Sequence, residues 1–405
     1  MTNTTSAPQL LDPLLQLAAA TAVGSVGLAA GGTAGALAAA EITGSTGAAG
    51  FPLGTLVVGS GAGALLISWW TRRTGRRAAL AGGYLVGTAG AIITAAAIGM
   101  QNFGLLLVGS AALGFANAAV FLSRYAAADN TAGAHRGRTM GLILAAAAIG
   151  AVAGPNLLGP GGALADAVGL PRVAGVYLVA VLSFGLAAAL LWRGGRGAVE
   201  DASRHLARTP VRIAAPMTRR ALAVLGATNL AMVATMAIAP VHMEHNGHGL
   251  TVVGFVVSGH VLCMFAPAAL WGRLGDRAGH HVVIALGAGL LIAAGVAGAG
   301  VNTAHAGAMA AVLALLGLGW SAGVVGASAM LVGSVPDAAR PRVEGYGEVA
   351  MSLAAGGGAP LAGVLASSGG FAALCLAAAA VGLAALTAVW QGAAERPAAG
   401  SGVSA

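Results

Sequence analysis

Residues 282–300 read VVIALGAGLLIAAGVAGAG, an apolar run that contains no charged side chain. About 20 helical residues, at 1.5 Å rise per residue, cross the roughly 30 Å hydrocarbon core of a bilayer. The run therefore predicts a membrane-spanning helix. It follows directly on the polar turn GRLGDRAGHH at 272–281. The same succession of apolar run and short polar turn recurs along the chain.

The composition agrees with many membrane spans. Of the 405 residues, 58% are hydrophobic and 8% are charged, against about 25% charged in a soluble domain. The 66 glycines suit close helix packing inside a membrane. We expect an all-α membrane protein with twelve transmembrane helices, at about 14–40, 51–70, 78–98, 104–125, 139–158, 173–192, 220–241, 251–271, 282–300, 307–333, 344–368 and 371–391.

The arginines orient these helices, because cytoplasmic loops of membrane proteins collect positive charge. Only Arg172 falls on the opposite side of the membrane from the others, so we expect both termini to be cytoplasmic, in a multi-pass protein of the inner cell membrane. The arginines of the cytoplasmic side are Arg72, Arg73, Arg76, Arg77, Arg124, Arg136, Arg138, Arg193, Arg196, Arg204, Arg208, Arg212, Arg219, Arg220, Arg273, Arg277, Arg340, Arg342 and Arg396.

The longest polar stretch, residues 193–219, divides the helices six and six. We expect two pseudo-symmetric halves, 1–192 and 220–391, joined by this cytoplasmic linker and followed by a cytoplasmic tail at 392–405. An internal repeat supports the division. The turn around Gly75 recurs around Gly279, and the segment around Gly154 recurs near Gly358, both at an offset of 204 residues.

Several function classes are disfavoured. The net charge of +8 is spread over short loops, so nucleic acid is not expected as a partner. No catalytic triad, metal-hydrolase spacing or phosphate loop indicates an enzyme, and no cofactor is expected. Cys263 and Cys375 supply neither a disulfide framework nor a zinc site. The first thirteen residues lack arginine, so we expect no cleaved signal peptide.

The turn GRLGDRAGHH resembles the signature G-x-L-x-D-R-x-G-R-R of the major facilitator superfamily, at Gly272, Asp276, Arg277 and Gly279. His280 and His281 replace the last two basic residues. The resemblance implies the major facilitator fold, whose six-helix halves hold a small substrate between them near the membrane midplane. Asp276 would then face a helix N-terminus and act in gating on the cytoplasmic side. Alternatively, residues 272–281 form only a solvent-exposed turn on the cytoplasmic side, without a role in gating.

Two further segments qualify the resemblance. The corresponding turn SWWTRRTGRR has Ser68 in place of glycine and Arg72 in place of aspartate, so a first-half latch is not expected. The segment GAVAGPNLLGPGG, with Gly154 and Pro155, resembles a helix 5 motif of proton-driven exporters, and its simplest role is a bent, closely packed helix. Ser110 stands where many exporters carry arginine, and the acidic residues Glu41, Asp166 and Glu348 lie near predicted helix ends, which weakens the exporter hypothesis.

Soft metal ligands gather on predicted helices 7 and 8. Met232 and Met236 are four residues apart, as are His260 and Met264, so each pair shares one helical face. Met232 and His260 each lie about nine residues, or roughly 14 Å, from the outer helix end. Thioether and imidazole groups favour copper over hard cations. Methionine at helical spacing is also common core filler, but a histidine inside a membrane helix indicates function.

The segment between these helices, HMEHNGH, adds His242, Met243, His245 and His248, which we expect to capture the metal at the outer mouth. The two pairs M-x-x-x-M and H-x-x-x-M resemble those of CcoA-type copper importers, the CalT family. The resemblance implies copper as the transported substrate, with Met232, Met236, His260 and Met264 as its ligands and an unidentified copper recipient in the cytoplasm. Two alternatives stay open: a proton-coupled exporter of drugs or small molecules, and a copper-responsive membrane sensor or assembly partner.

Overall fold

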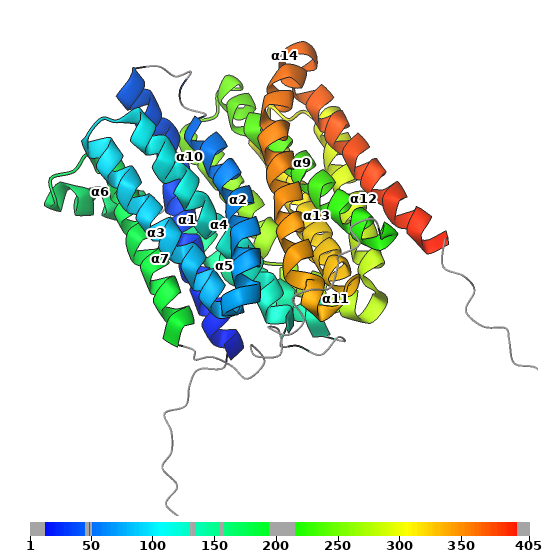
Figure 1. The fold of residues 1–405 in the computed structure, drawn as a ribbon. Coiled ribbons are helices and arrows are strands. Elements are labelled where there is room, and N and C mark those ends of the chain that lie inside the picture. The colour runs from blue at the N-terminus through cyan, green and yellow to red at the C-terminus, as the bar shows by residue number, and fades with distance from the viewer. Residues whose placement is uncertain are drawn as a thin grey trace, which may run out of the picture. The chain divides into compact units, whose positions relative to one another are not determined.

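The computed structural model describes residues 13–44, 48, 51–129, 131, 135–153, 157–193 and 215–394, and this part of the chain is helical without strands. Figure 1 shows the helices in chain order. They are α1 (Pro13–Thr43), α2 (Phe51–Thr74), α3 (Arg76–Gly99), α4 (Phe103–Asp129), α5 (Arg136–Ala153), α6 (Leu158–Ala167), α7 (Gly175–Arg193), α9 (Pro216–His245), α10 (Leu250–Phe265), α11 (Ala268–Ala278), α12 (His280–Gly300), α13 (Ala306–Gly333) and α14 (Arg340–Ala394), with short 3₁₀ helices at Arg172–Ala174 and Asp337–Ala339.

Within the described residues, eleven helical segments are long and apolar enough to cross a membrane, and α1 contributes a shorter apolar segment at Pro13–Leu28. The predicted all-α membrane fold is therefore confirmed. Helices suit this setting because every backbone group between their ends is hydrogen-bonded within the helix. The protein is a multi-pass membrane protein.

Three of the predicted helices differ in the structure, because one is interrupted and two are joined. The predicted span 251–271 breaks between α10 and α11 at Pro267, where proline has no N–H to donate and its ring crowds the preceding turn. The predicted helices 344–368 and 371–391 both belong to α14, which is drawn in orange and red in Figure 1. A sharp bend separates them at Gly370, whose φ is 69°.

The chain divides into two compact units, residues 1–130 with 149–207, and residues 131–148 with 208–405. In the first unit, α4 packs on both α2 and α3. Glycines allow the contact between α2 and α4, because a Cβ at Gly59 would lie 1.9 Å from the Ala111 carbonyl oxygen, and one at Gly114 would lie 2.4 Å from that of Leu56.

In the second unit, α14 packs on α9 and α12, and α13 packs on α10 and α12. Residues 131–148 belong to this unit because α5 approaches α11 closely through glycine. A Cβ at Gly141 would lie 2.1 Å from the Ala268 carbonyl oxygen, and one at Gly272 would lie 2.0 Å from the Gly137 carbonyl oxygen. No side chain fits at either position.

The repeated turn is visible in the backbone. Gly75 lies between α2 and α3 with φ 89°, and Gly279 lies between α11 and α12 with φ 94°. Both are left-handed conformations that a residue with a Cβ adopts only at a cost. The glycine shared by the two turns is therefore required by the sharp reversal of the chain.

Arg124 lies inside a helix that is longer than predicted. It belongs to α4, which continues to Asp129, and its side chain is fully buried. The guanidinium donates to the Phe121 carbonyl oxygen at 2.8 Å and to the Tyr125 hydroxyl at 3.1 Å, and it also lies over the Tyr125 ring. These contacts allow the helix to extend past the predicted end at residue 125.

Candidate functional site

His260 is the best-defined member of the predicted metal site. Its side chain is 2% exposed, and Nδ1 lies 2.6 Å from the carbonyl oxygen of Leu313 on α13. A carbonyl oxygen only accepts, so Nδ1 carries the proton and donates it. Nε2 is then left with a lone pair, and it is buried without a hydrogen-bond partner among the described residues.

This arrangement is the usual one for a histidine that binds a metal. Metal-binding histidines donate the N–H of their second nitrogen to a carbonyl or carboxylate, which fixes the ring and its tautomer. Met264, one turn after His260 on α10, is 7% exposed. Cys263 is half-buried, and its Cβ and the His260 ring both lie against Gly317 of α13. One nitrogen and two sulfur donors thus share this part of α10.

The other predicted pair lies on α9. Met232 is half-buried, and Met236 packs against the buried cluster that contains Ala239, Val253 and Val256. The contacts of His260, in contrast, are with α13, against which α10 mainly packs. The structure therefore brings His260 and Met264 together on one helix and Met232 and Met236 together on another.

A buried tryptophan on α13 relates the depths of the two pairs. Trp320 donates its indole N–H to Asn229 on α9 at 2.9 Å, and its ring meets that of Phe265 on α10 edge-on at 5.6 Å. Asn229 on α9 and Phe265 on α10 therefore both contact Trp320. At 1.5 Å per residue along each helix, Met232 lies about 4.5 Å outward of Asn229, whereas Met264 and His260 lie about 1.5 Å and 7.5 Å outward of Phe265. That the two pairs meet at one depth stays a prediction.

The predicted outer capture residues lie on or beside the end of α9, which extends to His245 rather than ending near residue 241. His242 stacks on Phe371 at 4.5 Å, and its Nε2 lies 3.0 Å from the Thr303 hydroxyl. His248 Nε2 lies 2.7 Å from the carbonyl oxygen of Ala304. Met243 is fully buried in the apolar core, and His245 is exposed. Capture of a metal by these residues stays a prediction.

The signature turn places Asp276 at the N-terminus of α5. The Asp276 carboxylate accepts the backbone N–H of Gly137 through Oδ1 and that of Arg138 through Oδ2, both at 2.8 Å. The first N–H groups of a helix have no partner within it, and negative charge is favoured there. Gly272 permits this approach, because its Cα lies against the backbone of Gly137. Arg277 lies in the last turn of α11, and Gly279 follows the end of that helix.

We expect Gly272→Ala to disturb this contact, because the new methyl group would overlap the Gly137 carbonyl oxygen. Overpacking of this kind costs about 1–3 kcal/mol. The measurement is transport by membranes with equal amounts of protein, which should fall. Gly289→Ala on α12 is the matched control, since nothing lies within 4 Å of a Cβ built there. Equal transport by both variants would show that the contact is dispensable.

The first-half turn is held differently. Arg76, in the first turn of α3, pairs with Asp129 at the end of α4, with 2.6 Å between Nη2 and the carboxylate. The basic residue of this turn is therefore paired with a carboxylate on a neighbouring helix of the same unit. Arg72 lies in the last turn of α2. Gly154 and Pro155, named for the helix 5 motif, lie outside the described residues.

One buried carboxylate was missed at the sequence level. Glu348, expected near a helix end, is 4% exposed, and Glu344, one turn earlier on α14 and not singled out from the sequence, is fully buried. Carboxylates within membrane helices are costly and mark functional positions. The spacing Glu-x-x-x-Glu in RVEGYGEVA was the available signal.

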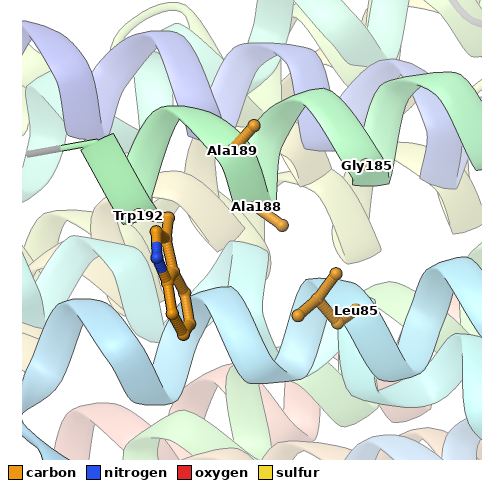
Figure 2. A pocket seen from close by; sticks show the side chains of 5 residues that line it. All are labelled: Leu85, Gly185, Ala188, Ala189 and Trp192. Carbon is orange, nitrogen blue, oxygen red and sulfur yellow. The ribbon is translucent and has the colours of Figure 1, made fainter.

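The first unit has a surface pocket that none of the residues named above lines. Figure 2 shows it between α3 and α7, lined by Leu85, Gly185, Ala188, Ala189 and Trp192. Trp192 is 71% exposed and Leu85 is 50% exposed. A tryptophan at the end of an apolar helix typically lies at the membrane–water interface, so we expect this pocket to face the lipid. Among the described residues, no group of three or more His, Cys, Asp or Glu side chains is placed to hold a metal.

Comparisons with known proteins agree with the fold. A profile of the Major Facilitator Superfamily matches residues 17–234 and 221–403. The uncharacterized MFS-type transporter YddS of Bacillus subtilis is 32% identical over 374 residues, which are 89% of this chain and 86% of that protein. The riboflavin transporter RfnT of Brucella anthropi is 30% identical over 313 residues, 74% of this chain and 75% of that protein.

Among solved structures, a bacterial homologue of the iron transporter ferroportin, in an outward-facing state with soaked iron, superposes with a TM-score of 0.75. The alignment covers 95% of this chain and all of that one, at 13% sequence identity. Similarity at this level of identity shows a shared fold.

Proposed function

The chain belongs to the Major Facilitator Superfamily, whose members are membrane transporters and not enzymes, and on that premise we propose that it imports copper. The observation that carries this proposal is His260, whose proton is fixed on Nδ1 by Leu313 and whose Nε2 lone pair is buried. Burying such a polar atom is costly unless it finds a partner. A metal ion passing through the protein supplies that partner.

The neighbouring donors support copper as the ion. Thioethers are soft ligands that select Cu(I), whereas Mg²⁺ and Ca²⁺ require oxygen ligands. Met264 lies one turn from His260 on α10, and Met232 lies about one turn outward of Asn229 on α9, the residue that binds Trp320. In this proposal Met232, Met236, His260 and Met264 bind copper transiently, and alternating access of the two halves carries the ion inward.

Cell-associated copper tests the proposal. Cells that express this chain should accumulate copper in a saturable manner above cells that carry an inactive control. The metal is the transported substrate, so accumulation must exceed the amount of protein present by a wide margin. Accumulation that only equals the protein content would instead favour the sensor or assembly role, and no accumulation would contradict copper transport.

Riboflavin is a second candidate substrate, favoured by the 30% identity with RfnT over most of the chain. The same cells, given labelled riboflavin, distinguish the two substrates. Riboflavin uptake without copper uptake would replace the first proposal with the second.

Import also requires an orientation in the membrane. We infer that the arginine-rich side, with both termini and the 193–219 linker, faces the cytoplasm. A tag inserted between Asn246 and Gly249 should then react with a membrane-impermeant reagent in intact cells, whereas a tag in the linker should react only after lysis. Labelling of the linker from outside would reverse the orientation and the proposed direction.

A further inference from the structure

Asn229 lies where three helices of the second unit meet. It is 7% exposed on α9, and its side chain bridges the other two helices. Nδ2 donates to the carbonyl oxygen of Met351 on α14 at 2.7 Å, and Oδ1 accepts the indole N–H of Trp320 on α13 at 2.9 Å. One neutral amide thus ties α9 to α13 and α14.

The chemistry of the position is demanding. An amide carries both a donor and an acceptor without a charge, so it satisfies the Trp320 N–H and the Met351 carbonyl oxygen together. Leucine would remove the Oδ1 acceptor of the buried indole N–H, and aspartate would place a charge in a membrane helix. Packing alone therefore does not account for asparagine here.

The hydrogen bond between Asn229 and Trp320 lies close to both ligand pairs of the candidate metal site. Met232 follows Asn229 by three residues, so it lies on the same side of α9 about one turn further out. On the other side, the Trp320 ring meets Phe265 edge-on with an interplanar angle of 69°, and Phe265 adjoins Met264. Rotation or sliding of α9 against α13 would break the 2.9 Å hydrogen bond and shift Met232 relative to His260.

We propose that Asn229 is a positioning residue of the copper site, which holds Met232 at the depth and rotation at which its sulfur and the His260 nitrogen bind one ion. This inference rests on the copper transport proposed above. Asn229 does not touch the ion. It acts through Trp320, which contacts both α9 and α10, and so holds the position of α9 relative to α10.

The test uses the purified full-length protein in detergent, loaded with Cu(I). X-ray absorption at the copper edge reports the sulfur and nitrogen ligands, and a competing chelator reports the affinity. Asn229→Leu and Trp320→Phe should each lose the sulfur coordination that Met232 contributes and weaken Cu(I) binding about tenfold, the usual scale for one lost buried hydrogen bond. Asn229→Gln keeps both functional groups and should restore part of the affinity.

Ser321→Ala is the control, because Ser321 is buried beside Trp320 and its hydroxyl has no partner among the described residues. It should bind Cu(I) like the parent. If the variants lose thermal stability but keep the parent's spectrum and affinity, Asn229 is only structural and the inference is wrong. If Asn229→Leu does not insert, Trp320→Phe decides. If the parent itself binds no Cu(I), the copper proposal fails.

Discussion

His260→Leu is expected to abolish copper accumulation while the protein still inserts into the membrane. Leucine removes the Nε2 lone pair, and it also removes a buried polar group whose presence is otherwise costly. Packing alone therefore predicts a neutral or mildly stabilising change, whereas a ligand role predicts loss of transport. The measurement is cell-associated copper at matched protein levels, with thermal stability of the purified variant alongside.

Met232→Leu and Met236→Leu extend the same experiment to α9. The exchange conserves volume and hydrophobicity, so packing predicts a cost below about 1.5 kcal/mol. Removal of one thioether from a site of three or four soft ligands should instead sharply reduce uptake. Because Met236 also packs against the apolar core, its variant separates the two roles most directly.

Met309→Leu and Met330→Leu on α13 are the controls. Met309 is fully buried in the same core, and Met330 is half-buried, so both methionines resemble those of α9 in surroundings but lie outside the proposed site. They should accumulate copper like the parent. If all five variants do so, the proposed site does not bind the transported substrate, and riboflavin becomes the leading candidate.

The fold was largely predictable because bilayer thickness fixes the length of an apolar run. The residues at which the helices end were not predictable in the same way. The polar run HMEHNGH was expected to form a loop, yet α9 continues to His245. His242 can remain helical there because its ring stacks on Phe371 and hydrogen-bonds to the Thr303 hydroxyl. Such partners lie far away in the sequence, so hydropathy alone places the helix end too early.

The candidate site shows the same limit. Helical spacing predicted that His260 and Met264 share a face, and both are buried residues of α10. It could not predict that Leu313 fixes the histidine tautomer, or that Asn229 reaches Trp320 across 91 positions. These contacts depend on which helices become neighbours. A single polar residue within an apolar run is the only signal the sequence offers, and many such residues lack a distant partner.

The partner of Asp276 was also hidden, although its role at a helix N-terminus was expected from the signature. The two N–H groups that it binds belong to Gly137 and Arg138, 139 and 138 positions earlier. Each is in the first turn of α5, where the backbone offers donors without any characteristic side chain. The sequence therefore identifies the carboxylate but not the helix that it caps.

Asp276→Asn should slow transport and shift the protein toward inward-open forms. The amide keeps the size of the side chain, but its –NH₂ group cannot accept from the second N–H, and the negative charge at the helix N-terminus is lost. A cap of this kind is worth about 1 kcal/mol, or roughly a fivefold change in the balance between two conformations. If this contact stabilises a form closed on the cytoplasmic side, that form becomes less populated.

Two measurements check this expectation: substrate uptake, and the rate at which a cysteine introduced on the cytoplasmic side reacts with a thiol reagent. Uptake should fall and the reaction should become faster. Asp166→Asn is the matched control, because Asp166 pairs with Arg172 at an exposed helix end and the exchange removes the same charge. Asp276→Asn behaving like this control in both measurements would remove Asp276 from the gating mechanism and leave it as a cap of α5.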